Sequence, residues 1–362
     1  KEPFSISYHT FEYTESLIVK ICLENGLKGW GEGVPTDVLD NSGTRESFNE
    51  GCYVSKLLLG KQATDDTFSN FFKKATSSIL KTAFDIALWD LRAKIQNKPV
   101  YALLGTNKRA MPPNCITVFL KDSLEETKKE AERILTHYKG LQVLKIKLKG
   151  KDDIERCKVI KEAAPANMKY VVDANQGFKR AEEAIKVLKE VKKILGEVVL
   201  FEQPMDKENL DGACQVTEAL KPLVTVADES CENLSNLKEI IEKKAFSGIN
   251  IKIQKMGGLT PSLRIAEEAV KHNLSLMVGQ MFETPLSTAA GAAFGKGVKG
   301  VLLTDLDLDL ELPKFCNGFV PFKDGKREPL EEKGFGFSLN EDYLIKLKQE
   351  ELLSFNKEEL AL

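Results

Sequence analysis

The strongest constraint on this chain is a regular alternation that begins at Asn114. From there, short runs of apolar and β-branched residues alternate with charged segments of helical length and spacing. Strands that alternate with helices pair in parallel, since each helix carries the chain back to the same end of the sheet. The runs are Cys115–Leu120, Val143–Ile146, Tyr170–Val172, Val198–Phe201, Leu223–Ala227, Gly248–Ile251, Leu274–Val278 and Val301–Leu303.

This rhythm predicts an α/β fold, a modified TIM or (β/α)-barrel of seven to eight βα units. The number is a range because no amphipathic helix directly follows Leu303, so the eighth unit is expected to be incomplete. An open doubly wound sheet has the same alternation and is the alternative. Helices are predicted at Leu124–His137, Ile154–Ala163, Ala181–Leu195 and Leu234–Lys243, among others.

The first part of the chain mixes strand and helix without this rhythm. A strand is predicted over Ser16–Leu23, a turn over Glu24–Gly26 and a long helix over Ser78–Gln96. We therefore predict an α+β domain over residues 1–110, the barrel over 111–320, and a C-terminal segment over 321–362. The stretch Glu341–Leu360 of that segment is expected to pack back on the first domain.

Charge and cysteine usage exclude several classes of protein. The net charge of -2 gives no electrostatic reason to expect a nucleic acid or an anionic membrane as partner. No apolar run approaches the ~18 residues that span a bilayer, and the start at Lys1 shows no signal-peptide pattern. It also lacks an initiator Met, so the completeness of the N-terminus is left open. The seven cysteines form no C-x-x-C pair, which predicts reduced, buried thiols in a cytoplasmic protein.

Charged residues end many of the predicted strands. In a barrel, the carboxyl ends of the strands meet at one mouth, where catalytic groups lie. Asp173, Glu202 and Asp228 end three consecutive strands, and three carboxylates without His or Cys favour a hard cation, with Mg²⁺ the default. The alternative is that each acid caps a helix in solvent.

Lysines end two other strands of the same set. Lys145 and Lys147 share one face of their strand because side chains alternate, and Lys252 ends a strand across the mouth. Two lysines on opposite sides of a substrate carbon can remove a proton and return it on the other face, which inverts the centre. Taken singly, each lysine is better explained as a surface residue at the end of a strand. None of the three histidines ends a predicted strand, which disfavours a His base.

At these residues the chain resembles the enolase superfamily, in particular its muconate-lactonising subgroup. The resemblance spans nearly the whole chain and implies that residues 1–110 and the C-terminal segment form a capping domain. It further implies that Lys147 and Lys252 are the acid/base pair, with Lys145 and Asn175 in support, and that homo-oligomers are common. One Mg²⁺ per subunit is implied on Asp173, Glu202 and Asp228. The matching motifs are Leu144–Lys147, Asp173–Gly177, Glu202–Pro204, Ala227–Ser230, Asn250–Gly258 and Ala83–Leu91.

The end of the eighth strand suggests the substrate. Asp305-Leu306-Asp307 resembles the D-x-D with which dipeptide epimerases hold the substrate's α-ammonium, although Asp307-Leu308-Asp309 fits the pattern too. His9 stands in a loop over Phe4–Tyr13 where relatives that act on glutamate carry Arg, and Glu283 follows the seventh strand. These residues make a small dipeptide the expected partner.

The expected activity is therefore a two-base epimerase acting on L-Ala-D/L-Glu, a dipeptide of peptidoglycan peptide metabolism. An o-succinylbenzoate synthase or cycloisomerase of the same subgroup is the first alternative. A barrel that binds a ligand or Mg²⁺ without catalysis is the second.

Overall fold

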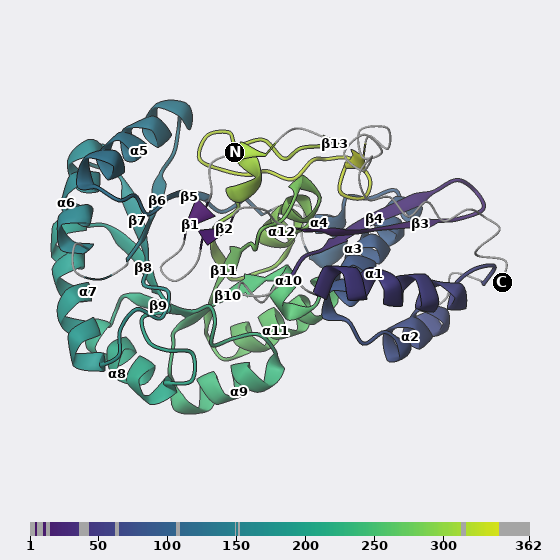
Figure 1. Ribbon diagram of the computed structural model, residues 1–362, viewed down its shortest axis with the longest axis horizontal. Coiled ribbons are helices and arrows are strands. Elements are labelled where there is room, and N and C mark those ends of the chain that lie inside the picture. The colour runs from purple at the N-terminus through teal and green to yellow at the C-terminus, as the bar shows by residue number, and fades with distance from the viewer. Residues whose placement is uncertain are drawn as a thin grey trace.

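The computed structural model describes residues 4–5, 10–11, 15–35, 43–61, 65–105, 109–148, 150, 153–312 and 316–339. Two bodies make up the molecule (Figure 1), a barrel of strands surrounded by helices and a smaller cap that lies against it. Three short two-stranded pairings accompany them. One joins β1 (Phe4–Ser5) to β2 (Thr10–Phe11), and another joins β13 (Cys316–Asn317) to β14 (Ser338–Leu339).

The barrel is a single sheet of eight parallel strands that follow one another in chain order. An isolated bridge between Asn114 and Thr304 joins its first and last strands. The predicted barrel is thus confirmed, and the doubly wound alternative is wrong because such a sheet reverses its strand order. The strands are β5 (Cys115–Val118), β6 (Val143–Lys147), β7 (Lys169–Asp173), β8 (Val198–Glu202), β9 (Val224–Ala227), β10 (Gly248–Lys252), β11 (Ser275–Gly279) and β12 (Val301–Thr304).

Helices cover the outside of this sheet, and three of the four predicted ones have the predicted ends. The first begins after Ser123 because this residue and Glu126 form a reciprocal capping box. In the part of the chain described after β12, a short 3₁₀ turn, η2 (Leu308–Glu311), stands where the eighth helix would be, as predicted. The helices are α5 (Leu124–His137), α6 (Asp153–Ala163), α7 (Ala181–Leu195), α8 (Leu210–Leu220), α9 (Leu234–Lys243), α10 (Ile253–Met256), α11 (Leu259–Lys271) and α12 (Pro285–Gly297).

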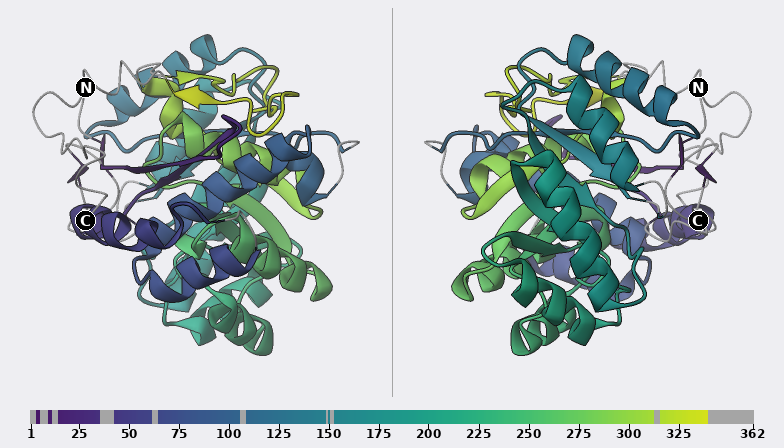
Figure 2. Two further views of the ribbon diagram at one scale, coloured as in Figure 1. Left: turned by 90° about the vertical axis from the view of Figure 1, so that its right-hand side faces the viewer. Right: turned by 90° about the vertical axis from the view of Figure 1, so that its left-hand side faces the viewer.

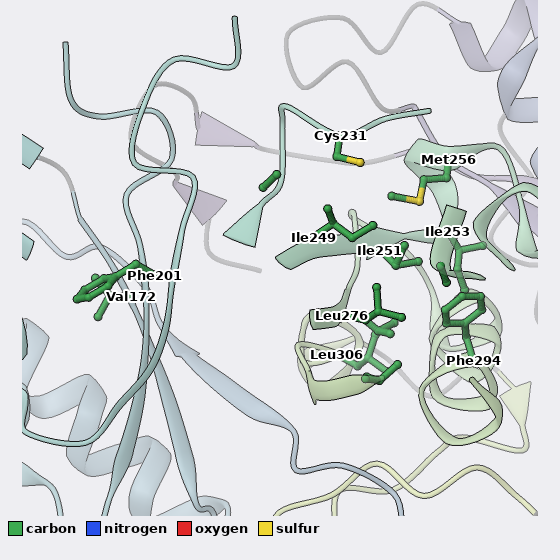
Figure 3. Packing of buried hydrophobic residues seen from close by; sticks show 14 of the residues in the cluster. Val172, Phe201, Cys231, Ile249, Ile251, Ile253, Met256, Leu276, Phe294 and Leu306 are labelled. Atoms are coloured by element: carbon green, nitrogen blue, oxygen red, sulfur yellow. The ribbon is translucent and has the colours of Figure 1, made fainter. Parts of the chain in front are cut away.

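The alternation of side chains divides the barrel core into two parts. Outward-facing residues pack against the helices in one large cluster, and Figure 3 shows part of it, with Ile249 and Ile251 on β10 near Leu276, Phe294 and Leu306. Inward-facing residues fill the barrel itself. This inner cluster takes one side chain from each of seven strands, namely Cys115, Val143, Val171, Leu200, Val226, Met277 and Leu303.

The cap is built on a helix and a hairpin in direct contact. Gly29, Gly31 and Gly33 alternate along β4, and a Cβ at Gly31 would lie 1.9 Å from the carbonyl oxygen of Ala83. Only glycine therefore allows this strand to lie directly on α3. Figure 2 shows the strand beside the helix. The elements of the cap are β3 (Leu17–Cys22), β4 (Lys28–Gly33), α1 (Gly43–Val54), η1 (Ser55–Leu57), α2 (Asp65–Lys74), α3 (Ser78–Ile95) and α4 (Val100–Leu104).

The C-terminal segment returns to this cap (yellow in Figure 1). The backbone of Gly334 exchanges hydrogen bonds with Lys98 and Val100, and Phe335 N donates to Asp90 Oδ1 at 3.0 Å. The predicted contact through Glu341–Leu360 lies outside the described residues. The division at residues 110 and 320 stays a prediction.

Asp90 joins three parts of the chain, and its removal is expected to destabilise the fold. This fully buried carboxylate accepts hydrogen bonds from Trp30 N and Phe335 N, each at 3.0 Å, and pairs with Lys94 Nζ at 2.6 Å. Asp90→Ala removes the carboxylate that these donors share, although Lys94 keeps its contact with Lys28 O, and it should cost roughly 3 to 5 kcal/mol in urea unfolding. Asp90→Asn keeps the acceptor oxygen and should cost less. Equal stability of both variants and the parent would contradict this role.

The cysteines and helices bear on two further expectations. Six cysteines of the described part are free thiols, but only Cys115, Cys157 and Cys231 are buried. Cys22 is exposed, so the expectation that the thiols are buried is wrong there. This side chain lies at the end of a cap strand, outside the core. None of the described helices is both long and apolar enough to cross a membrane.

Candidate functional site

The candidate site is the ring of side chains that lies directly above the inner cluster. A residue two positions further along a strand points to the same side of the sheet. Polar groups therefore follow the apolar filling at the carboxyl ends of the strands, and all of them are buried. They are Thr117, Lys145, Asp173, Glu202, Asp228, Asn250 and Asp305, with Gly279 at the remaining strand.

Lys145 stands at the centre of this ring. Its Nζ lies 2.7 Å from Glu202 Oε2, 2.7 Å from Asp305 Oδ2 and 3.2 Å from Asp173 Oδ2. Burial alone would lower the pKa of Lys145, but the three carboxylates outweigh it and raise the pKa well above its usual value. Lys145 is therefore a fixed ammonium that holds carboxylates together, consistent with the supporting role that the sequence predicts.

Lys147 lies two residues beyond Lys145 on β6, so its side chain points to the same side of the sheet. Its Nζ contacts Asp173 Oδ2 at 3.1 Å and Asn175 Oδ1 at 2.9 Å. The backbone N–H of Asn175 in turn donates to Asp173 Oδ1 at 2.9 Å. Asn175 has a positive φ of 41°, a conformation that Asn tolerates better than most residues. The loop after β7 thus holds its own carboxylate and steadies Lys147.

Lys252 shares its carboxylate with a second lysine. Asp228 Oδ2 accepts from Lys252 at 2.8 Å, and Asp228 Oδ1 accepts from Lys255 at 2.7 Å. Burial acts to raise the pKa of Asp228, yet the two ammoniums hold it well below the usual range. Burial likewise opposes charge on Lys252, but Asp228 raises its pKa. Gln203 Oε1 fixes the turn by accepting from Asp228 N at 2.9 Å.

Lys147 and Lys252 face the ring from opposite sides. In the strand order of the barrel, three strands separate β6 from β10 on one side and three on the other. Strands so placed lie across a barrel of eight from each other. A small molecule at the centre of the mouth would have one lysine on each face.

The carboxylates between these lysines repel one another. Burial first, and then the neighbouring Asp173, raise the pKa of Glu202 to about 7. Glu229 is similar, with a pKa raised to about 7 and an Oε2 atom that has no hydrogen-bond partner. Crowded, buried oxygen ligands of this kind are those that Mg²⁺ prefers, and a cation relieves their repulsion. As placed here, no three His, Cys, Asp or Glu side chains of the described chain form a metal cage, because lysine ammoniums contact the carboxylates instead.

The eighth strand brings two of its three acids to the ring. Asp305 contacts Lys145 and accepts from the Cys115 thiol at 3.2 Å. Asp307 Oδ2 accepts from Thr117 N at 2.7 Å, and burial followed by the charge of Asp305 raises the pKa of Asp307 to about 7. Asp309 differs, because it is fully buried in a bidentate pair with Arg327, both distances being 2.8 Å.

Two other substrate contacts are predicted from the sequence, Glu283 and His9. Glu283 is buried and accepts from Met281 N in its own loop at 2.9 Å. Burial raises its pKa well above the usual value, and the charge of Glu32 in the cap adds to this. His9 lies outside the described residues, so its expected contact with the substrate stays a prediction.

Sequence reasoning did not assign site roles to Asn250 and Lys255. Asn250 Nδ2 donates to Glu202 Oε1 at 2.7 Å, and a Cβ at Gly279 would lie 2.7 Å from Asn250 Oδ1. The period of two would have found Asn250, which precedes Lys252 by two residues on the same face. Lys255 lies on a short helix after the strand, where that period no longer applies.

Comparison with known proteins extends over nearly the whole chain. Residues 126–343 match the family model for enolase C-terminal domain-like proteins, and residues 1–105 match that for the mandelate racemase/muconate lactonizing enzyme N-terminal domain. The L-Ala-D/L-Glu epimerase of Bacillus subtilis is 32% identical, with 86% of this chain and 85% of the relative covered. The D-Ala-D/L-Ala epimerase of Cytophaga hutchinsonii is 29% identical, with 96% and 95% covered.

A solved structure shows the same architecture. The dipeptide epimerase from Cytophaga hutchinsonii, complexed with Mg and the dipeptide D-Ala-L-Val, has a TM-score of 0.86 to this chain. The two are 28% identical, and the match covers 96% of this chain and 94% of that one. Similarity of sequence and similarity of fold thus agree along nearly the full length of both proteins.

Proposed function

The chain belongs to the mandelate racemase/muconate lactonizing enzyme family of the enolase superfamily, and from that membership we propose that it is a dipeptide epimerase. The curated relatives compared above are epimerases, which supports an isomerase. L-Ala-D/L-Glu is the substrate that we propose first, since the relative from Bacillus subtilis bears that name. The identity of the dipeptide is the more specific part of the proposal, because the Cytophaga hutchinsonii relative is named for a different dipeptide.

The observation that carries this proposal is the pair of buried carboxylates, Asp305 and Asp307, that follows β12 at the ring. Asp305 and Asp307 face the ring, whereas Asp309 is neutralised by Arg327. An ammonium group is the natural ligand of two such carboxylates, because charge-assisted hydrogen bonds are strong in a buried site. Asp305 already contacts Lys145, whereas Asp307 forms no ion pair with the described residues. A cycloisomerase substrate without an ammonium would leave Asp307 without a cationic partner, which argues against that alternative.

The lysines supply the proton transfer. With the α-carbon of the second residue between them, Lys147 or Lys252 removes the α-proton as a free amine, and the other returns a proton as an ammonium on the opposite face. Both lysines contact carboxylates in the structure. Each must loosen that contact before its Nζ can accept a proton, while Lys145 stays charged beside the carboxylate ring.

We place Mg²⁺, one per subunit, on Asp173, Glu202 and Asp228. When bound, it would stabilise the negative charge that develops on the substrate carboxylate as the proton leaves. The repulsion that raises the pKa of Glu202 supports this assignment, as does the Mg in the structure from Cytophaga hutchinsonii. Asn250 would steady Glu202, and Lys255 would steady Asp228, through the hydrogen bonds described above.

Binding of the substrate ammonium is expected to depend on pH through Asp307. Its raised pKa of about 7 means that it loses its negative charge as the pH falls through that value. The KM for a dipeptide should therefore rise below about pH 7, and rise again above about pH 8 as the substrate's amine deprotonates. Asp307→Asn should raise KM at every pH and should abolish the further rise of KM below about pH 7. Glu202 and Glu229 titrate in the same range, so an acidic limb of KM that persists in this variant would assign it to them.

The proposal is tested by NMR of L-Ala-L-Glu with the protein and Mg²⁺ in D₂O. Loss of the Glu α-proton signal with appearance of the L,D epimer is the expected result. If no exchange occurs, a library of dipeptides follows, and an N-acylated amino acid and a cycloisomerase substrate are added. Exchange only with compounds that lack an ammonium would overturn the dipeptide assignment, and exchange with none would favour a non-catalytic barrel.

Two further expectations belong to this proposal. We place the enzyme in the cytoplasm, consistent with six free thiols in the described part of the chain. We also expect a homo-oligomer, which sedimentation would measure.

A further inference from the structure

The segment between Asp305 and Asp307 is held from two directions. Both of the peptide groups that join these residues pass through Leu306, whose N–H belongs to the first and whose carbonyl belongs to the second. The N–H of Leu306 donates to Asn114 Oδ1 at 3.0 Å. Its carbonyl accepts from Arg327 Nη1 at 2.8 Å and from Asn114 Nδ2 at 3.3 Å. Every hydrogen-bonding position of this residue's backbone is thus occupied by a buried side chain.

Arg327 comes from the far end of the chain, yet it is fully buried here. Besides the carbonyl of Leu306 it binds both oxygens of Asp309 at 2.8 Å, and its guanidinium lies 5.2 Å from the ring centre of Phe319. The segment that carries it is tied to the same place, because Asn114 N donates to Gly325 O at 2.8 Å. Asn114 and Arg327 therefore form one clamp around Leu306.

This clamp acts differently on the three acids. A planar guanidinium that binds a carboxylate through two hydrogen bonds neutralises it and fixes its direction, so Asp309 is withdrawn from the barrel mouth. Asp305 and Asp307 keep their contacts with Lys145 and Thr117. This turn thus presents the carboxylates of Asp305 and Asp307 to a ligand. It also neutralises Asp309, whose negative charge would otherwise lie beside them.

We propose that Arg327 and Asn114 are positioning residues for substrate recognition: they set the spacing of Asp305 and Asp307, so that the enzyme selects substrates with a free α-ammonium. The proposal deepens the function given above and rests on it. Neither residue touches the substrate in this scheme. Their effect on Asp305 and Asp307 passes through the backbone of Leu306, and Asp309 pairs with Arg327 instead of the ligand.

The clamp itself is tested without any assay of activity. The variant Arg327→Met/Asp309→Leu removes both buried charges together and so leaves no unpaired ion. Hydrogen exchange measured by mass spectrometry should become about tenfold faster in peptides that cover residues 304–309. The matched control is Arg156→Met, which removes another buried arginine whose guanidinium donates to Thr127 Oγ1 at 2.8 Å. That control should leave exchange at residues 304–309 unchanged.

Its effect on recognition is tested with L-Ala-L-Glu and N-acetyl-L-Ala-L-Glu. The double variant should raise KM for the free dipeptide about tenfold, with kcat within a few-fold, and lose most of the preference over the acetylated compound. Arg327→Lys keeps the charge and should recover part of that preference. If the double variant does not fold, Arg327→Lys is compared with the parent instead, and a smaller preference for the free dipeptide is expected.

The outcomes separate the clamp from the proposed function. Unchanged exchange at residues 304–309 would overturn the clamp, whatever the activity. Faster exchange with an unchanged preference for the ammonium would overturn its part in recognition. If the parent enzyme turns over neither compound nor any dipeptide of the library, the proposed function fails and recognition through the clamp fails with it.

Discussion

Replacing Lys147 or Lys252 by Ala should lower the rate of epimerisation by about a thousandfold or more, since a positioned acid/base group contributes roughly 10²- to 10⁴-fold and both directions need both lysines. The two lysines lie on strands on opposite sides of the barrel. Each variant should therefore still wash out the α-proton of one epimer in D₂O, and the two variants should act on different epimers. NMR of both epimers with each variant measures this directly.

A buried lysine outside the ring provides the matched control. Lys296 on α12 pairs with Glu328, and its ammonium lies 5.0 Å from the ring centre of Tyr101, away from the carboxylates of the mouth. Lys296→Ala should keep near-parental turnover once its stability is taken into account. If Lys147→Ala and Lys252→Ala exchanged the proton of the same epimer, the two-base scheme would be wrong, because a single base would then serve that face.

Removal of the divalent cation should have an effect of similar size. EDTA is expected to abolish epimerisation, and Mg²⁺ added in excess should restore it, because the developing charge on the substrate carboxylate otherwise lacks its main stabilising partner. A second readout needs no turnover. Mg²⁺ at a hundredfold excess over its Kd should stabilise the folded protein by about 2.7 kcal/mol, which calorimetry detects as a rise in Tm.

Glu202→Gln connects that result with the proposed ligand set. The variant should lose activity and no longer gain stability from Mg²⁺. Without the metal it should be more stable than the parent above pH 7. Burial raises the pKa of Glu202 in the folded protein to about 7, so folding disfavours its ionised form and costs stability as the pH rises. A full Mg²⁺-dependent rise in Tm in this variant would remove Glu202 from the ligand set.

Much of the barrel can be predicted from local pattern. Each β-branched run became a strand within a few residues of its predicted ends, since a buried parallel strand needs apolar side chains on both faces. Lys145 lies within such a run and Asp173 directly follows one, so both could be located from the sequence. The helix α12 was not named in advance. It is rich in Ala and Gly and buried along its whole length, so it lacks the amphipathic pattern that marks a surface helix.

The remaining site features depend on contacts between distant segments. Arg327 binds Asp309 across 18 residues, and Asn250 meets Glu202 across 48. No local period encodes such pairs, so the sequence left both registers of D-x-D open. The structure places Asp309 in a buried ion pair, which favours the pair Asp305 and Asp307.

The return of the C-terminal segment to the cap has a consequence for synthesis. Asp90, made early, receives a hydrogen bond from Phe335, made near the end. The cap can therefore complete these hydrogen bonds only after almost the whole chain, including every strand of the barrel, has been synthesised. A nascent chain halted before residue 334 would carry α3 with one of its polar groups unsatisfied and α4 without its backbone partner. A premature stop codon late in the message would thus leave hydrogen-bonding groups within the first hundred residues without their partners.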